Sequence, residues 1–233
     1  MMMTIDLKSW TPRCLPPRSP IAGRFVRIEP FQAEDHLAGL WQAYSADRAG
    51  HIWDYLPYGP FADADAFYDW GAAFYASPDP MFHVIRDARS NAILGVASLM
   101  RITPEHGVIE VGHICYGPAL QATPAATEAQ FLLARRVFDE LGYRRYEWKC
   151  NNANAASKGA AERLGFTFEG VFRQHLIVKG RNRDTAWFSM LDREWPACKA
   201  AFECWLSVDN FDEQGQQIRS LADFRKDGDG RSA

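Results

Sequence analysis

Hydrophobic and polar residues repeat with two distinct periods along this chain, and these periods predict both strands and helices. Alternation with a period of two is typical of half-buried strands. It predicts strands at residues 24–29, 81–87, 92–102, 108–116, 144–150, 166–172, 175–178 and 185–191. Apolar residues at helical spacing predict helices at residues 33–46, 63–76, 127–141, 154–164 and 194–206. We therefore expect an α/β (α+β) protein with a mixed, mostly antiparallel sheet of six to seven strands flanked by helices.

The chain divides into three segments. Four prolines in residues 1–22 remove backbone hydrogen-bond donors and predict an extended N-terminal arm. Residues 23–206 contain the predicted strands and helices and are expected to form one domain. Residues 207–233 are polar and end in a run of Gly, Asp and Arg, so we expect a tail that frays.

The composition is that of a soluble globular protein. Of the 233 residues, 47% are hydrophobic and 24% are charged, which excludes a disordered or collagen-like chain. The net charge of −3 provides no overall basic field that would attract nucleic acid or an anionic membrane. No stretch approaches the roughly 20 apolar residues that a membrane span needs. These features predict a cytoplasmic protein without a membrane partner.

The cysteines are five in number and widely spaced, with no CxxC pair. This spacing is typical of neither a zinc ribbon nor a disulfide framework. We therefore expect reduced, buried thiols, as in cytosolic proteins, and no metal ion.

Aromatic residues make up 13% of the chain, and most of them occupy predicted helix stripes or strand faces. A loop at residues 53–61 is the exception, because it contains Trp53, Tyr55 and Tyr58 between prolines and a glycine. These side chains are suited to an apolar wall with hydroxyl groups at its rim, which would bind a small amine or a peptide N-terminus. The alternative is that they pack the early helices against the sheet.

The segment at residues 118–128 connects a predicted strand to the strongest predicted helix. Thr123 is suited to cap this helix, with Pro124 at the first helical position. The backbone N–H groups of Ala125, Ala126 and Thr127 would then point outward without partners, at the positive end of the helix dipole. Small side chains there would let a phosphate approach, so the segment is a candidate anion site. An ordinary capped helix is the alternative.

A second motif, at residues 151–157, follows a predicted strand and precedes a predicted helix. Asn154 is expected to cap that helix, and Ser157 would lie one turn later on the same face. As capping chemistry alone, this arrangement is common.

Taken in order, these segments resemble the GNAT superfamily of acyl-CoA-dependent N-acyltransferases, over about residues 23–191. The branch that the chain resembles most is that of the ribosomal-protein alanine N-acetyltransferases (RimJ/RimL-like). The family's pyrophosphate loop has the form Arg/Gln-x-x-Gly-x-Gly/Ala followed by Thr-Glu-Ala. It is matched here by Gln121, Ala126, Thr127, Glu128 and Ala129. Pro124 stands where a glycine is expected, and this departure implies weakened or rearranged pyrophosphate contacts.

The resemblance implies transfer of an acyl group, with acetyl as the default, from acetyl-CoA or another acyl-CoA to a primary amine. The amine would belong to a small molecule or a protein N-terminus and would attack directly in a ternary complex. In this family, two splayed central strands hold the acyl group and the pantetheine arm. Those strands would be residues 108–116 and 144–150, with main-chain donors at His113, Ile114 and Cys115.

The resemblance also suggests catalytic side chains, although alternatives remain open. Glu110 would share a strand face with Gly112 and Ile114, and as a partly buried carboxylate with raised pKa it would relay a proton through water. A solvent-facing Glu110 is the alternative. The same alternation places His113 on the opposite face, so we rank it below Glu110. His175 is a candidate for the acceptor side from a later strand.

The general acid is less well defined. Many family members use a tyrosine in the helix after the Asn motif, and that position is Ala161 here. Ser157 is the nearest hydroxyl to the expected sulfur position, whereas Asn154 would hold the splayed backbone or the pantetheine arm. The missing tyrosine and Pro124 keep open a catalytically silent acyl-CoA-binding sensor or adaptor.

Three partner questions also stay open. An RNA- or ribosome-binding module would rest only on the basic turn at residues 179–183. Binding that ignored salt concentration would argue against it. The acceptor amine and a homodimer are not decided by the sequence.

Overall fold

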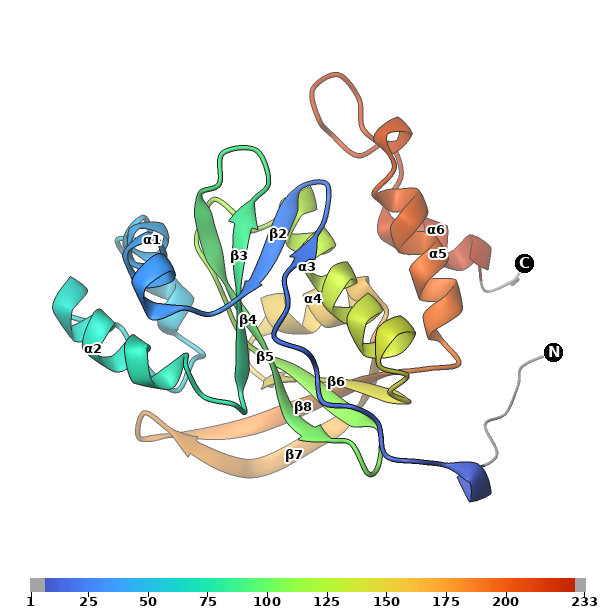
Figure 1. Ribbon diagram of the computed structural model, residues 1–233, viewed down its shortest axis with the longest axis horizontal. Coiled ribbons are helices and arrows are strands. Elements are labelled where there is room, and N and C mark those ends of the chain that lie inside the picture. Colours follow the sequence, from blue (N-terminus) through green and yellow to red (C-terminus); the bar gives the residue numbers. More distant parts are fainter. Residues whose placement is uncertain (1–6, 229–233) are drawn as a thin grey trace.

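In residues 7–228, which the computed structural model describes, eight strands form one sheet in the order β1-β2-β3-β4-β5-β6-β8-β7 (Figure 1). Neighbouring strands are antiparallel except β5 and β6, which run parallel. The strands are β1 (Ile21–Ala22), β2 (Val26–Pro30), β3 (Met81–Asp87), β4 (Ile93–Thr103), β5 (Val108–Tyr116), β6 (Arg145–Asn151), β7 (Thr167–Val178) and β8 (Arg181–Leu191). The mixed, mostly antiparallel α/β class is therefore confirmed, with a sheet one strand larger than the predicted maximum.

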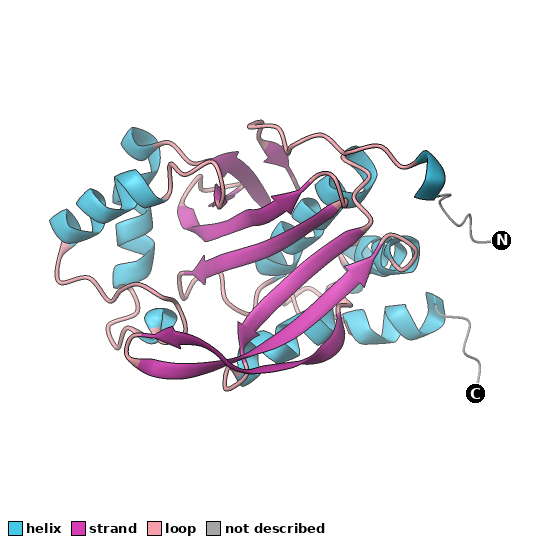
Figure 2. Ribbon diagram, turned by 90° about the horizontal axis from the view of Figure 1, so that it is seen from below, coloured by secondary structure: helices cyan, strands magenta, loops and turns pink. Residues whose placement is uncertain are grey.

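Helices cover both faces of this sheet (Figures 1 and 2). They are α1 (Ala33–Ser45), α2 (Ala64–Phe74), α3 (Pro124–Arg135), α4 (Ala155–Leu164), α5 (Trp195–Trp205) and α6 (Leu221–Gly228), with short helical turns η1 (Leu7–Ser9), η2 (His51–Trp53), η3 (Arg136–Glu140) and η4 (Val208–Asn210). Within residues 7–228, no helix combines the length and the apolar character that crossing a bilayer requires.

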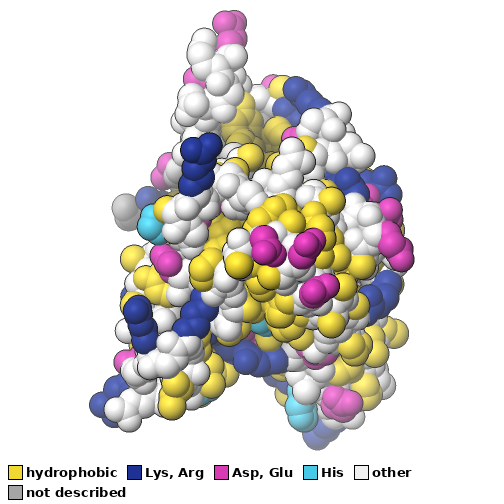
Figure 3. Space-filling view, turned by 90° about the vertical axis from the view of Figure 1, so that its left-hand side faces the viewer, with side chains coloured by type: hydrophobic (Ala, Val, Ile, Leu, Met, Phe, Trp, Pro, Cys, Tyr) yellow, Lys and Arg dark blue, Asp and Glu magenta, His cyan; other side chains and the backbone are white. Residues whose placement is uncertain are grey.

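Two hydrophobic clusters form the core, one on each face. The larger cluster lies under α3, α4 and α5 and includes Val111, Leu133 and Trp148. The smaller cluster is rich in aromatic rings, and it joins α1, α2 and η2 to β3 and β4. We call it the aromatic cluster. Figure 3 shows the outer face of these early helices, where hydrophobic side chains are exposed around acidic ones.

Helix α3 begins as its capping motif predicts but ends differently from the prediction. Thr123 adopts an extended conformation and its hydroxyl accepts the Ala126 N–H, so the helix starts at Pro124, three residues before the periodic segment at residues 127–141. Its last part is the π-helical turn η3, after which Gly142 adopts the left-handed conformation expected of a C-terminal glycine. The capping roles predicted for Thr123 and Asn154 are confirmed.

The prediction that residues from Ser207 onward fray is wrong for the described part of that segment. Asn210 is buried, and its side-chain amide donates to the carbonyls of Trp205 and Arg219. Leu221 of α6 is 1% exposed and belongs to the larger cluster. Residues 229–233 lie outside the described residues, as do residues 1–6 of the predicted arm. After the helical turn η1, the arm is extended up to β1 and is held by Arg13 Nε, which donates to the Gly142 carbonyl.

Candidate active site

The two parallel strands separate in the middle of the sheet. Pairing between β5 and β6 runs from Val108–Arg145 to Val111–Trp148 and stops there. Strand β5 stays paired with β4 up to Tyr116, and β6 stays paired with β8 up to Asn151. The expected splay of the central strands is therefore present, and it leaves an opening in the sheet beyond Val111.

A cavity of about 1320 Å³ extends through this region. On one side it is bordered by the N-terminal ends of α3 and α4, and on the other by η2, β7 and β8. Of the predicted site residues, it is lined by Tyr55, Glu110, His113, Ile114, Cys115, Gln121, Ala126, Thr127, Asn154, Ser157 and His175. Most of the candidate residues, though far apart in sequence, thus share one cavity.

A β-bulge changes the side-chain alternation of β5 at His113. Val96 pairs with Cys115 and Ser98 pairs with Gly112, so two residues of β5 between these pairs lie opposite one residue of β4. His113 takes up the extra residue with a φ of 47°, in the left-handed region that side chains other than glycine rarely adopt. The simple alternation that we used for this strand fails here.

The bulge reverses two predicted positions. Ile114 packs against the larger cluster together with Val111, whereas His113 contacts the aromatic cluster through the rings of Tyr58 and Phe82. A Cβ placed on Gly112 would lie 3.5 Å from Glu110 Oε1, so these two residues do share a face. His113 therefore lies on the Glu110 side of the sheet and Ile114 on the other, the opposite of the prediction.

His113 is neutral over the ordinary pH range. Burial, followed by the nearby Arg101 and Arg183 guanidinium groups, lowers the pKa of its imidazole to about 4. Its Nδ1 lies 3.3 Å from the Tyr58 hydroxyl, and the two rings stack.

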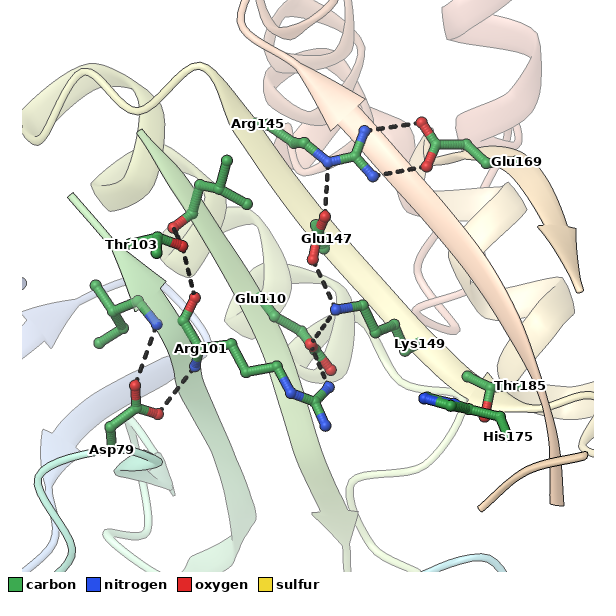
Figure 4. A network of polar contacts seen from close by, with 12 residues as sticks. Asp79, Arg101, Thr103, Glu110, Arg145, Glu147, Lys149, Glu169, His175 and Thr185 are labelled. Carbon is green, nitrogen blue, oxygen red and sulfur yellow. Dashed lines mark hydrogen bonds and ion pairs between the residues drawn. The ribbon is translucent and has the colours of Figure 1, made fainter. Parts of the chain in front are cut away.

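Glu110 is buried in a network of ion pairs and is not solvent-facing (Figure 4). Its Oε2 lies 2.7 Å from Arg101 and 2.9 Å from Lys149 Nζ, and Lys149 also contacts Glu147 at 2.8 Å. The network continues from Glu147 through Arg145 to Glu169. Glu110 is therefore not an isolated carboxylate, because it is the shared partner of two cations.

The predicted anion site at α3 has fewer unpaired donors than expected. Ala126 N–H donates to the Thr123 hydroxyl, and Thr127 N–H donates to the Thr123 carbonyl as the first bond of the helix. Both groups are therefore already paired, because a capping residue satisfies the third N–H of its helix and the fourth begins the helical ladder. Ala125 packs its side chain on the larger cluster and does not line the cavity. Ala122, just before the cap, has a φ of 57°.

The second motif lies at the other border of the opening. Asn154 caps α4 by accepting the Ser157 N–H at 2.9 Å, and the Ser157 hydroxyl accepts the Trp148 indole N–H at 3.0 Å. The position of the missing tyrosine, Ala161, is fully buried in the larger cluster. Ser157 is thus held in place by β6 beside the opening.

Neither cysteine at the cavity is primed as a nucleophile. Burial raises the pKa of the Cys115 thiol to about 12 and also raises that of Cys150. Both side chains therefore stay as thiols near neutral pH, whereas nucleophilic cysteines react as thiolates.

The aromatic loop contributes less to the cavity than we expected. Trp53 is 5% exposed and packs on Tyr44 and Phe61 within the aromatic cluster, so its predicted role as a cavity wall is wrong. Tyr58 stacks on His113, which lines the cavity, but Tyr58 does not line the cavity itself. Tyr55 does line the cavity, and its hydroxyl donates to the Ala153 carbonyl. The alternative, packing of the early helices, thus describes Trp53 and Tyr58.

Two further predicted residues make local contacts. His175 Nδ1 lies 3.0 Å from the Thr185 hydroxyl, at the irregular part of β7 between Phe172 and Leu176. Gln121 donates to the Tyr116 carbonyl at 2.9 Å and so ties the loop before α3 to the end of β5.

Several residues at the site were not predicted. Lys149 could have been found, because it follows Glu147 by two residues in a predicted strand and so shares its face. Arg163 of α4 donates to the Thr127 hydroxyl at 3.0 Å, beside the Trp205 ring. The C-terminal segment also lines the cavity, through Trp205, Phe211 and residues 215–217. No motif in the sequence of this segment predicts that contact. Among residues 7–228, no cluster of His, Cys, Asp and Glu is arranged to hold a metal ion.

Comparison with known proteins places this geometry in context. Residues 26–167 match the acetyltransferase (GNAT) domain family. The crystal structure of a GCN5-related N-acetyltransferase from Brucella melitensis is 51% identical, with a TM-score of 0.93 over 94% of this chain and 100% of that one. A GNAT-family acetyltransferase structure from Chromobacterium violaceum ATCC 12472 is 44% identical, with a TM-score of 0.77 over 84% and 98% of the two chains.

A curated relative from Bacillus subtilis (strain 168), YdaF, has a provisional name as a ribosomal N-acetyltransferase. It is 29% identical over 104 residues, which are 45% of this chain. The chain therefore spans 56% of the length of this curated relative.

Proposed function

The chain belongs to the GNAT acetyltransferase family, and on this premise we propose that it transfers an acetyl group from acetyl-CoA to a primary amine. The observation that carries the proposal is the cavity at the separation of β5 and β6, bordered by the two capped helices α3 and α4. The family's RimJ/RimL-like branch fits the ribosomal name of the curated relative. We propose direct attack of the amine in a ternary complex.

The pantetheine arm would lie along the opening between β5 and β6. Main-chain groups of His113, Ile114 and Cys115 are proposed to hold the acyl group and the arm, with Asn154 at the facing helix. The bulge supports this role, because it redirects the backbone of β5 just beyond its last pair with β6.

The pyrophosphate would lie at the start of α3, near Gln121, Ala126 and Thr127. Since the N–H groups of Ala126 and Thr127 are paired within the helix, Ala125 N–H and the helix dipole remain from the predicted set. Arg163 adds a cation where the sequence suggested only backbone, since its guanidinium lies against Thr127 at the cavity. We therefore propose that the rearranged pyrophosphate contacts implied by Pro124 consist of the Ala125 N–H and the Arg163 guanidinium.

The chemistry requires an amine nitrogen to attack the thioester carbonyl carbon. The C–S bond then breaks, the amide forms, the nitrogen gives up a proton and the CoA thiolate takes one up. We propose Glu110 as the base that receives the amine proton, directly or through water, with its Oε1 on the Gly112 side. Ser157 is proposed to donate a hydrogen bond near the sulfur.

A catalytically silent acyl-CoA binder is not favoured. Relatives that match nearly the whole chain carry acetyltransferase names, and the buried, ion-paired Glu110 lies at the cavity. Ala161 still leaves the family's tyrosine position vacant, so the proton for the leaving thiolate would come from Ser157 or from water.

Thiol release from acetyl-CoA with a panel of amines tests the proposal. The panel includes small primary amines and peptides with ribosomal-protein N-termini, which separates the two acceptor classes. CoA binding measured by calorimetry accompanies the assay. Turnover with an amine is the expected result. CoA binding without turnover over the whole panel would support the silent binder, and no CoA binding would refute the site.

Location and assembly complete the proposal. None of the five cysteines, all within residues 7–228, forms a disulfide, which fits a reducing cytoplasm. A homodimer is supported by the edge strand β7, where Phe168, Phe172 and Ile177 are exposed. Light scattering coupled to gel filtration is the test, and a monomer at micromolar concentration would argue against the homodimer.

A further inference from the structure

Arg183 of β8 is a cation without a counter-ion at the cavity. It lines the cavity, pairs with Leu176 of β7 through the backbone, and has a buried Nε with no hydrogen-bond partner. Within residues 7–228, no carboxylate lies within ion-pair distance of its guanidinium. Burial lowers the pKa of this guanidinium, so its charge is poorly solvated. A poorly solvated, unpaired charge is costly unless a ligand completes it.

The neighbouring charges are already paired with one another. Glu110 is bound by Arg101 and Lys149, and Lys149 is shared with Glu147. Arg183 lies on the same face of the sheet as Lys149, because Lys149 pairs with Trp187 and Asn151 with Thr185, and β8 alternates. The face at this end of the cavity therefore carries one positive charge more than its carboxylates balance.

This excess charge is unfavourable for a simple cationic ligand. Arg101 and Arg183 are close enough to His113 to lower the pKa of its imidazole, so their field reaches the bulge. An ammonium ion near the bulge would be repelled in the same way. A neutral amine, which is the form that attacks a thioester, would be favoured.

We infer that the acceptor carries an anionic group, a carboxylate or a phosphate, which Arg183 binds while the amine lies toward Glu110. This inference rests on the proposed acetyl transfer and names its substrate class. The anionic group of the acceptor would form an ion pair with the Arg183 guanidinium, and its amine would give its proton to Glu110. Arginine is suited to this role because its fork of donors matches both oxyanions.

Matched pairs of acceptors test the inference without any variant. Amino acids and short peptides are assayed as free carboxylates and as C-terminal amides, and phosphoethanolamine is compared with ethanolamine. We expect kcat/KM for the anionic member of a productive pair to be roughly ten- to hundredfold higher. The two sets of pairs distinguish carboxylate from phosphate. Equal or better turnover of the neutral members overturns the inference and leaves the proposed function intact.

Substitution of the arginine then assigns the effect to one residue. Arg183→Gln should remove the preference by raising KM for the anionic acceptor far more than KM for its neutral partner, with CoA affinity unchanged. Arg181→Gln is the matched control, since Arg181 is exposed on the same strand and does not line the cavity. Arg183→Lys, which keeps the charge, should retain part of the preference and serves if the Gln variant does not fold. A preference that survives Arg183→Gln refutes the role of Arg183, and absence of CoA binding by the unmodified protein refutes the proposed function itself.

Discussion

Lys149 and Glu110 meet across the two parallel strands, with Nζ 2.9 Å from Oε2 and both side chains about 95% buried. The same ammonium contacts Glu147 at 2.8 Å and lies 3.8 Å from the centre of the Trp187 ring. A single buried cation therefore holds two carboxylates just before the point where β5 and β6 separate. Its removal would leave two acids facing each other.

Lys149→Met should destabilise the fold. The loss should be about 3 kcal/mol, because breaking a buried ion pair leaves uncompensated charge, although Arg101 and Arg145 still contact the two acids. Urea unfolding measures it. The control is Lys199→Met, because Lys199 and its partner Asp139 are each about one-third exposed and their pair should contribute under about 1 kcal/mol. Equal effects of the two substitutions would contradict this account.

Glu110→Gln should slow catalysis without weakening CoA binding. Loss of a general base lowers the rate by about 10²- to 10⁴-fold, and the amide keeps the shape of the side chain. Single-turnover kinetics with acetyl-CoA gives the rate, and calorimetry gives the affinity. Glu169→Gln removes a carboxylate from the far end of the same network, away from the cavity, and should leave the rate within a few-fold. A Glu110→Gln enzyme as fast as the original would exclude the proposed base.

The protein should lose stability in mild acid. Burial lowers the pKa of His83 to about 4, as it does for His113. Both values lie below the unfolded value of about 6.5, so the unfolded chain binds more protons between these limits. Stability is then nearly constant above about pH 7.5 and falls by about 2 kcal/mol per histidine by pH 5.

Urea midpoints at pH 7.5, 6.5 and 5 measure this loss. His83→Leu should flatten the slope by about half, whereas His51→Leu, on an exposed side chain, should leave it unchanged. A stability profile that is flat from pH 7.5 to 5 would show that the two imidazoles are not held neutral.

Arg163→Ala should weaken CoA binding about tenfold, the effect of losing one hydrogen bond from a charged group. The loss should vanish for S-acetylpantetheine, which lacks the nucleotide and its phosphates. Arg225→Ala is the control, because Arg225 contacts the end of α4 without lining the cavity. Equal losses for both ligands would place Arg163 away from the phosphates.

Local sequence patterns predicted most of the elements and the helix caps. The boundaries of β3 and β5 match the predicted segments, because turn residues flank both strands, at residues 89–91 and at residues 104–107. Thr123 and Asn154 were recognisable because a capping side chain acts on its own helix, within a few residues.

The errors arose where distant parts of the chain decide the structure. The bulge at His113 is set by its register with β4, so alternation within β5 could not show it. Trp53 is buried because it packs on the rings of Tyr44 in α1 and Phe61 in the following loop, although the sequence of its own segment is typical of a surface loop. Within the described part of the chain, Arg183 has no ion-pair partner because the nearby carboxylate of Glu110 pairs with Arg101 and Lys149, and these contacts between strands are not visible in the sequence.

The C-terminal segment gives the site a thermodynamic link to folding. Phe211 and Gln216 border the cavity. The neighbouring Asn210 side chain donates to the carbonyl of Trp205 in α5 and to that of Arg219, two residues before α6. A ligand that contacts this border binds only to molecules in which the segment is folded, so its binding free energy adds to the stability of both helices. Ligand binding in the cavity and folding of the last two helices are therefore coupled: a ligand stabilises the folded helices, and unfolding of the helices weakens ligand binding.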